Sequence, residues 1–207
     1  LVEDADRMVK RHEIHMLPVM QNGRLVGIVT DRDIKIASGS VANSGIKEYD
    51  RDLLAGIKVR TIMTPDAVTV PENHTLEETV ETFLIHRISG APVVDQQQQV
   101  IGVITKSDLF NLILVLTGYG KKGLQLGIEV EDRPGCIKTI TDIIREYGGR
   151  ISSILYTPER ADKGNRRLYI RVFDLDQPSL RHFLETLRER STLLYIVDHN
   201  EKKREWF

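Results

Sequence analysis

Apolar residues in the first part of the chain recur at the spacing of helices and then of strands. The first twelve residues place one face of a predicted helix on Leu1, Val2, Ala5, Met8, Val9 and His12. Residues 14–20 form a short apolar strand, and Asn22-Gly23 after it is typical of a two-residue hairpin turn. Residues 25–30 predict a second strand, and residues 33–37 predict a helix. The pattern indicates a unit of helix, hairpin and helix.

The same order of elements returns about 75 residues further along the chain, which is the mark of an internal repeat. Thr75 to Glu78 forms a capping box that begins a helix with Leu76, Val80 and Phe83 on one face. The elements after it are predicted as a strand, a turn, a strand and an apolar helix, at residues 88–94, 95–99, 100–105 and 107–116. Between the two copies, residues 38–58 are polar and predict a connector.

The second copy, residues 59–116, begins with a lead-in that the first copy, residues 1–40, lacks. A short helical turn is predicted at 59–63 and a strand at 67–70. Comparison of the two copies indicates that roughly sixteen residues are missing from the front of the first copy. We therefore expect the first copy to be N-terminally incomplete, and Leu1 in place of an initiator methionine indicates a fragment or a processed chain.

A polar motif is kept in both copies. Each copy has a Pro-Val strand, at Pro18 and at Pro92, followed by a second strand that ends in a shared pattern. The pattern is Gly-hydrophobic-hydrophobic-Thr-x-x-Asp-hydrophobic, at residues 27–34 and 102–109. Polar residues kept at the end of an apolar strand favour a ligand over a core, so the chain is predicted to bind a ligand twice.

The hydroxyl and the carboxylate of this motif suit a nucleotide. Thr30 and Thr105 lie at a predicted helix start, where unpaired backbone N–H groups can hold a phosphate. Asp33 and Asp108 lie three positions further on, and each carboxylate has two acceptor oxygens that match a pair of ribose hydroxyls. The alternative is that each Thr is only a helix cap and each Asp only favours the helix dipole.

A different pattern begins after residue 123. Residues 117–123 are rich in glycine and predict a linker. Apolar and polar residues then alternate from Leu124, and Pro134 is predicted to start a helix that ends at Gly148-Gly149. Further elements follow as strand, strand, helix and strand, at residues 151–157, 168–172, 180–187 and 193–197. This βαββαβ order usually forms an antiparallel sheet with two helices on one face.

Composition and motifs narrow the function classes. The chain has 207 residues and a net charge of −1, without the basic excess of a nucleic-acid binder. The apolar run at 109–116 is too short to span a bilayer. A single cysteine, Cys136, excludes an internal disulfide, and we predict a cytoplasmic protein. The six histidines show no metal spacing and no nucleophile motif is present, so no catalytic residue, no metal site and no enzymatic activity are predicted.

The repeated motif resembles a pair of CBS domains, also called a Bateman module. The C-terminal part resembles an ACT domain, on the strength of Asp132-Arg133-Pro134-Gly135 after its first strand and of Gly148-Gly149. Together they resemble the acetoin-utilisation CBS-ACT family. The expected fold is mixed α+β, with a tandem CBS pair and a ferredoxin-like ACT domain. The domain boundaries are predicted as 1–116 for the CBS pair, 117–123 for the linker, 124–199 for the ACT domain and 200–207 for a polar tail.

The CBS resemblance implies a regulatory ligand, either an adenine nucleotide (AMP, ADP or ATP) or S-adenosylmethionine. It implies that the aspartates bind ribose, that the threonines or their neighbours bind phosphate, and that the Pro-Val strands lie against adenine. The implied site residues are His15, Met16, Pro18, Thr30, Arg32, Asp33, Ser89, Gly90, Pro92, Thr105, Lys106 and Asp108. We rank the first site below the second, because its lead-in is absent and because His15 and Met16 replace the smaller Ser89 and Gly90.

The ACT resemblance implies an amino acid at the strand-to-helix loop, and its implied site residues are Asp132, Arg133, Pro134, Gly135 and Cys136. The alternative is a plain turn before a helix, with Cys136 in the core. The predicted function is a homodimeric or larger regulatory protein that senses small molecules and acts on an unidentified target enzyme. Two other interpretations stay open: a scaffold with empty pockets, and an amino-acid sensor whose CBS pair is structural.

Overall fold

The computed structural model describes residues 1–207 except 38–55, 121 and 176. It divides into two compact units, Leu1–Leu109 and Phe110–Phe207. The end of the first predicted copy, at residue 40, and most of the predicted connector lie outside the described residues. No helix in the described ranges is long and apolar enough to cross a membrane.

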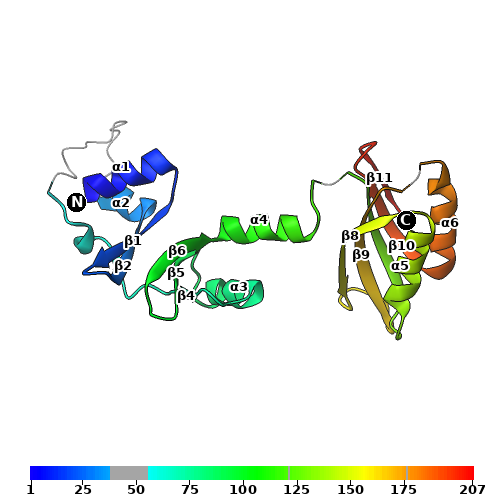
Figure 1. The fold of residues 1–207 in the computed structure, drawn as a ribbon, viewed down its shortest axis with the longest axis horizontal. Helices are drawn as coiled ribbons and strands as arrows, with labels where there is room; N and C mark the ends of the chain where they lie inside the picture. Colours follow the sequence, from blue (N-terminus) through cyan, green and yellow to red (C-terminus); the bar gives the residue numbers. More distant parts are fainter. Residues whose placement is uncertain (38–55, 121, 176) are drawn as a thin grey trace. The chain divides into compact units, whose positions relative to one another are not determined.

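The first copy forms a helix, a hairpin and a second helix (Figure 1). Its elements are α1 (Val2–His12), β1 (Met16–Gln21), β2 (Arg24–Thr30) and α2 (Asp31–Ala37). The predicted turn is confirmed, because Asn22 and Gly23 have φ angles of 50° and 76°, as such hairpin turns require. A small core joins the helices to the sheet through Val2, Ala5, Val9, Val29 and Ile34.

The helix α2 begins two residues earlier than predicted. The reason is that the hydroxyl of Thr30 accepts a hydrogen bond from the backbone N–H of Asp33 at 3.3 Å. Thr30 therefore has the role of an N-cap, and the helix starts at the next residue, Asp31.

The lead-in of the second copy connects the two copies. It forms a 3₁₀ turn, η2 (Val59–Thr61), and two short strands, β3 (Thr64–Pro65) and β4 (Val70–Pro71). The strand β3, which was not predicted, pairs antiparallel with β2 of the first copy. The strand β4 pairs parallel with β5 of the second copy. It contains only Val70 of the strand predicted at 67–70 and extends to Pro71. One segment therefore completes the sheet of each copy.

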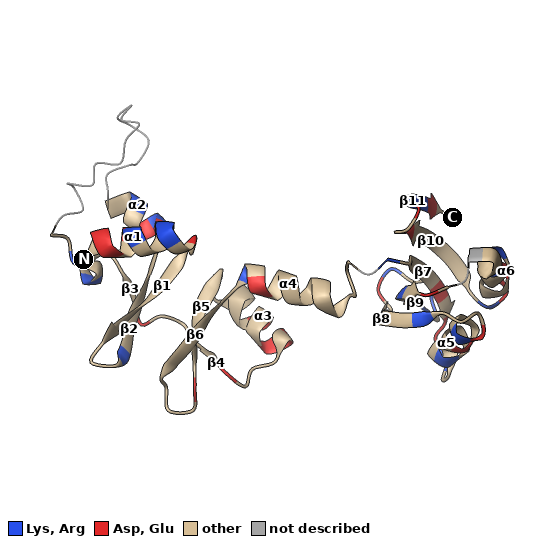
Figure 2. Ribbon diagram, turned by 45° about the horizontal axis from the view of Figure 1, so that its top comes forward, with Lys and Arg blue, Asp and Glu red and all other residues tan. Residues whose placement is uncertain are grey.

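The second copy repeats the first. Its elements are α3 (Leu76–Ile85), β5 (Gly90–Val94), β6 (Val100–Thr105) and α4 (Lys106–Leu116). The capping box is confirmed: Glu78 N–H donates to the Thr75 hydroxyl at 3.2 Å, and Thr75 N–H donates to the Glu78 carboxylate at 2.7 Å. The core consists of Val70, Phe83, Ala91 and Leu109. The charged residues of α4 lie at its start, and the rest of the helix carries no charge (Figure 2).

The C-terminal unit is an antiparallel sheet with two helices on one face (Figure 1). Its elements are β7 (Leu124–Glu131), α5 (Cys136–Glu146), β8 (Arg150–Thr157), β9 (Asn165–Phe173), η3 (Gln177–Ser179), α6 (Leu180–Arg190), β10 (Thr192–Asp198) and β11 (Lys203–Trp206). The strand order is β11-β10-β7-β9-β8. The predicted βαββαβ order is present, and its core packs alternate residues of β7 and β9 against Ile140, Ile144, Phe183 and Leu187.

Three details of this unit differ from the prediction. The helix α5 starts at Cys136 and not at Pro134, because Gly135 has a φ of 86°, which no helical residue adopts. Residues 200–207 are polar but not a free tail, since β11 pairs with β10. The start of the predicted linker is held on the sheet, where the Ser153 hydroxyl donates to the carbonyl of Thr117 at 2.9 Å.

Candidate functional site

The strand-to-helix turns of the two copies have the same backbone geometry. In the first copy the backbone N–H of Asp31 donates to the carbonyl of His15 at 3.1 Å. In the second copy the N–H of Lys106 donates to the carbonyl of Ser89 at 2.9 Å. Each bond ties the first residue of a helix to the residue just before the first strand of the hairpin in the same copy. The repeat is therefore kept in three dimensions at the place where the ligand was predicted.

The motif carboxylates are held by their own turns. Oδ2 of Asp33 accepts hydrogen bonds from the N–H of Thr30 at 2.8 Å and from its hydroxyl at 2.6 Å. Asp108 and Thr105 make the same two bonds at the same two distances. The capping role that was left open is thus present in both turns. Among the described residues nothing donates to Oδ1 of either carboxylate, so that atom is available to a ligand.

A cavity of about 500 Å³ lies between the two turns. It brings together eight of the twelve predicted site residues: His15, Met16, Thr30, Arg32, Ser89, Gly90, Thr105 and Lys106. Ile28, Asp31, Ile88 and Ser107 complete its wall. The other four predicted residues do not line it. Pro18 and Pro92 lie within their strands, opposite Ile28 and Val103, and the two aspartates face their own threonines.

The two halves of this cavity differ in bulk. Met16 lies opposite Thr30 in the first hairpin, and Gly90 lies opposite Thr105 in the second, so the two residues are equivalent. Met16 is 8% exposed, and its methyl group lies 3.4 Å from the place that a Cβ on Gly90 would take. The space beside Gly90 is therefore partly filled by Met16 of the first hairpin and by Thr105 of its own, whose Cγ2 lies 3.5 Å from the same place.

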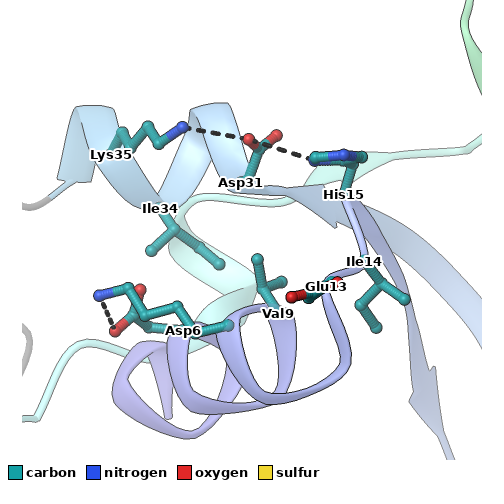
Figure 3. A pocket seen from close by; sticks show the side chains of 9 residues that line it. Asp6, Val9, Glu13, Ile14, His15, Asp31, Ile34 and Lys35 are labelled. Atoms are coloured by element: carbon teal, nitrogen blue, oxygen red, sulfur yellow. Dashed lines mark hydrogen bonds and ion pairs between the residues drawn. The ribbon is translucent and has the colours of Figure 1, made fainter.

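The halves also differ in charge. The first residue of α2 is Asp31, whose carboxylate lies 3.2 Å from Lys35 Nζ and 3.6 Å from His15 Nδ1 (Figure 3). Burial alone would raise the pKa of Asp31, but the hydrogen bond and charge of Lys35, helped by His15, lower it below its usual range. The carboxylate is therefore ionised at neutral pH. The equivalent first residue of α4 is the exposed cation Lys106.

A second cavity in the first copy, of about 450 Å³, lies between α1 and α2 (Figure 3). Four of the charged residues in its wall are already paired within each helix, Lys10 with Asp6 at 2.8 Å and Lys35 with Asp31 at 3.2 Å, and the remaining charged residue is the carboxylate Glu13, which would repel a phosphate. We therefore regard the cavity between the turns as the better candidate for a ligand.

The loop between β7 and α5 forms a third cavity, of about 340 Å³. All five predicted residues line it: Asp132, Arg133, Pro134, Gly135 and Cys136. Cys136 is 7% exposed and belongs to the core, as expected. Arg166 also lines this cavity and was missed, because its place depends on the register of β9 against β7, where it lies opposite Val130.

Arg166 gives the loop a cationic group. Its guanidinium forms an ion pair with Asp132 and lies 5.1 Å from the centre of the Tyr156 ring. Its Nε is buried, and no described residue accepts a hydrogen bond from it. A buried donor without an acceptor is rare in folded proteins, so this atom is a candidate contact for a ligand oxygen.

Two copies of one strand-to-helix unit around a shared cavity define the N-terminal unit as a tandem module of the CBS type. The CBS domain model matches residues 1–39 and 59–115. A CBS domain-containing protein of Dictyostelium discoideum is 33% identical over 111 residues, which are 53% of this chain and 77% of that protein. The chain therefore belongs to the CBS-domain family.

Other relatives match about half of this chain. An uncharacterized protein of Methanocaldococcus jannaschii is 35% identical over 119 residues, which are 55% of this chain and 42% of that protein. Inosine-5'-monophosphate dehydrogenase of Korarchaeum cryptofilum is 33% identical over 53% of this chain and 20% of the enzyme. The chain thus spans less than half the length of these two relatives.

Solved structures of CBS pairs are also similar to this chain. The CBS domain pair of protein MJ0100, in complex with 5'-methylthioadenosine and S-adenosyl-L-methionine, is 27% identical. The match covers 54% of this chain and 80% of that one, with a TM-score of 0.44. CBSX2 in complex with AMP is 26% identical over 55% of this chain and 82% of that one, with a TM-score of 0.45.

Proposed function

We propose that the chain is a regulatory sensor whose CBS pair binds an adenine nucleotide or an adenosyl compound in the cavity between the two turns. The observation that carries the proposal is this cavity, which gathers Thr105, Lys106 and Gly90 from one copy and Thr30 and Arg32 from the other. Its volume of about 500 Å³ is within the range of small-molecule sites, ~300–1,000 Å³.

The second copy supplies the stronger half of the proposed site. A phosphate at the start of α4 would meet the Lys106 ammonium and the positive end of the dipole of an eleven-residue helix. The N–H groups of Lys106 and Asp108 already donate to the Ser89 carbonyl and the Thr105 hydroxyl, so the side-chain cation is the main contact.

Asp108 does not line the cavity, so a ribose would have to lie at the edge of the cavity to donate to the free Oδ1 of Asp108. Gly90 itself adds no side chain to the wall, although Met16 partly fills the space beside it. At the start of α2 the ionised Asp31 repels phosphate, and Met16 occupies space. We therefore assign the main contacts to the second copy.

Isothermal calorimetry with ATP, ADP, AMP and S-adenosylmethionine tests the proposal. We expect at least one of them to bind, and we expect Lys106→Ala to weaken a phosphorylated ligand. In a thermal-shift assay, a ligand at about 100 times its Kd adds roughly 2.7 kcal/mol to the free energy of unfolding. Binding of none of the four would contradict the proposal and favour the alternatives, a scaffold with empty pockets or an amino-acid sensor whose CBS pair is structural.

A second candidate function, amino-acid binding, is favoured by the buried Arg166 Nε beside the Asp132–Gly135 loop. The C-terminal unit has the element order of an ACT domain, and we assign it to that type. The carboxylate of an amino acid would bind Arg166, and its ammonium would bind Asp132. A thermal-shift screen with the common amino acids tests this role, and a Arg166→Gln variant should remove any stabilisation found.

The proposed mechanism is linkage between ligand and assembly. A ligand that binds one arrangement of the protein more tightly shifts the population toward it, and a target enzyme can respond to that shift. We further propose a homodimer, because α4 exposes Phe110, Ile113 and Leu114 to solvent by 64%, 42% and 43%. Light scattering at micromolar concentration measures the mass, and a monomer would contradict this part of the proposal.

A further inference from the structure

The C-terminal sheet has a second face, on the side opposite α5 and α6. Side chains alternate along β9, so Ile170 and Val172 point into the helix-covered core while Arg171 lies on the second face. Gln125 of β7 lies directly opposite Arg171 in the sheet register. These two residues are the centre of the feature described below.

Arg171 carries a charge that its surroundings do not neutralise. The residue is 7% exposed, and its Nη2 donates to the amide oxygen of Gln125 at 3.0 Å. No carboxylate among the described residues lies within ion-pair distance of its guanidinium. Burying a cation without a counter-ion is costly, because desolvation is not offset by an attractive charge.

The same two strands show what a neutralised arginine looks like. Glu129 lies four residues after Gln125 on β7, and Arg167 lies four residues before Arg171 on β9. Glu129 and Arg167 lie opposite each other in the same register. Their carboxylate and guanidinium are 3.1 Å apart, and Glu129 is 6% exposed. The equivalent cross-strand pair is Gln125 and Arg171, where an amide replaces the carboxylate. The two pairs therefore differ in one respect: the residue on β7 is a neutral amide at Gln125 and a carboxylate at Glu129.

Further cationic and polar groups surround Gln125. His199 Nε2 lies 3.5 Å from the Gln125 amide oxygen. Arg204 of β11 lies opposite Val197, which itself lies opposite Gln125, so the three are in one row across the sheet. Burial lowers the pKa of His199, and the charges of Arg171 and Arg204 lower it further, while the neighbouring Asp198 carboxylate opposes them with a smaller effect.

We propose that this face binds a small oxyanion, the carboxylate or phosphate group of a metabolite, between Arg171 and Arg204 beside Gln125 and His199. The anion supplies the negative charge that Gln125 lacks. None of these residues lines the cavity of the CBS pair or the Asp132–Gly135 loop, so the C-terminal unit gains a second candidate site with a different ligand.

The chain contains a local reporter for this test. Trp206 is its single tryptophan, and its ring lies 5.0 Å from that of Tyr195. Gln125 Nε2 donates to the Tyr195 hydroxyl at 3.3 Å, so an anion beside Gln125 should change the fluorescence of Trp206. The full chain is titrated with sodium phosphate and, separately, with sodium acetate, at neutral pH and at an ionic strength held constant with NaCl.

The matched variant is Gln125→Glu, which places a carboxylate opposite Arg171 as in the Glu129–Arg167 pair. We expect a saturable fluorescence change in the wild type. We expect Gln125→Glu to bind the anion at least about tenfold more weakly, and Arg204→Gln to lose less affinity than Gln125→Glu. We also expect the anion to raise the Tm of the wild type and Gln125→Glu to keep a Tm at least equal to it. A response to phosphate alone assigns a phosphorylated ligand, and a response to both assigns an oxyanion in general.

Two results would overturn the proposal. In the first, neither anion changes the fluorescence or the Tm of the wild type beyond the NaCl control. In the second, Gln125→Glu responds with the same affinity as the wild type, which would place the anion elsewhere.

Discussion

The two copies of the repeat share a backbone turn but place opposite charges at the first residue of the helix that follows it. Thr30 and Asp33 make the same hydrogen bonds as Thr105 and Asp108, whereas the helix that follows begins with Asp31 in one copy and Lys106 in the other. The Thr-x-x-Asp motif therefore maintains the turn, and we expect the residues between its Thr and Asp to decide which ligand each turn can accept.

The copies also differ at the edge of their sheets. A Cβ on Gly27 would lie 2.5 Å from the carbonyl oxygen of Thr64, because β3 covers that edge of the first copy. Gly102, the equivalent residue, has no described atom within 4 Å of such a Cβ. The same glycine is therefore required by packing in one copy and not in the other.

The largest expected effect concerns the two motif aspartates. Asp108→Ala should cost about 1.5–3 kcal/mol of nucleotide binding, which is roughly tenfold to a hundredfold in Kd, because a charged acceptor for ribose is lost. Asp33→Ala should cost less, since Met16 and Asp31 weaken the first half. Calorimetry compares the two.

Because each aspartate also holds its own turn, the control is Asp108→Asn. An amide can still accept from the N–H and hydroxyl of Thr105, so the turn is kept while the charge is removed. A larger loss in the Asp33 variants than in the Asp108 variants would reverse our ranking of the two halves.

The next effect concerns stability. Gly27→Ala should lower the free energy of unfolding by about 1–3 kcal/mol, because the added methyl group forces β3 away from β2. Gly102→Ala should change it by less than about 0.5 kcal/mol, because the methyl group enters open space. Urea denaturation of both variants measures the difference, and equal costs would show that β3 does not cover Gly27 in solution.

The sequence predicts those parts of the structure that depend on residues close together along the chain. The turn at Asn22-Gly23 and the capping box at Thr75 follow from residues a few positions apart, and both are confirmed. The pairing of β3 with the other copy and the pairing of β11 with β10 depend on tertiary contacts, and neither was predicted.

The candidate site divides in the same way. The repeat and the CBS resemblance together named eight of the residues that line the cavity between the turns, because equivalent positions of the two copies lie on either side of it. They did not predict that both aspartates would bind their own threonines. Arg166 was missed because only the register of β9, which is set after the turn at Gly164, brings it to the Asp132 loop.

A smaller effect is expected at the loop before α5. Gly135→Ala should cost about 1 kcal/mol, because an alanine is strained at a φ of 86° although no described atom would touch its methyl group. The variant should abolish any amino-acid stabilisation and leave nucleotide affinity unchanged. Thermal shift with both kinds of ligand checks this, and a loss of both responses would contradict it.

The smallest effect is a pH dependence. The pKa of Asp31 is lowered in the folded chain, so its ion pairs contribute stability above the pKa of the unfolded chain. That contribution is lost as the pH falls through the lower folded pKa, in the acid range. Because its partners Lys35 and His15 are exposed, Asp31→Asn should change stability at neutral pH by less than about 1 kcal/mol. Thermal melts from neutral to acid pH measure this contribution. An Asp31→Asn variant whose Tm falls toward acid pH as steeply as the Tm of the wild type would contradict the assignment.

The central claim, that charge at the first helix residue makes the second half the main phosphate site, is tested most directly by calorimetry on two charge reversals. We predict that Lys106→Asp weakens ATP or AMP binding by about tenfold or more, and that Asp31→Lys strengthens it or adds a second bound nucleotide. An unchanged affinity in Lys106→Asp, or weaker binding in Asp31→Lys, would contradict the account.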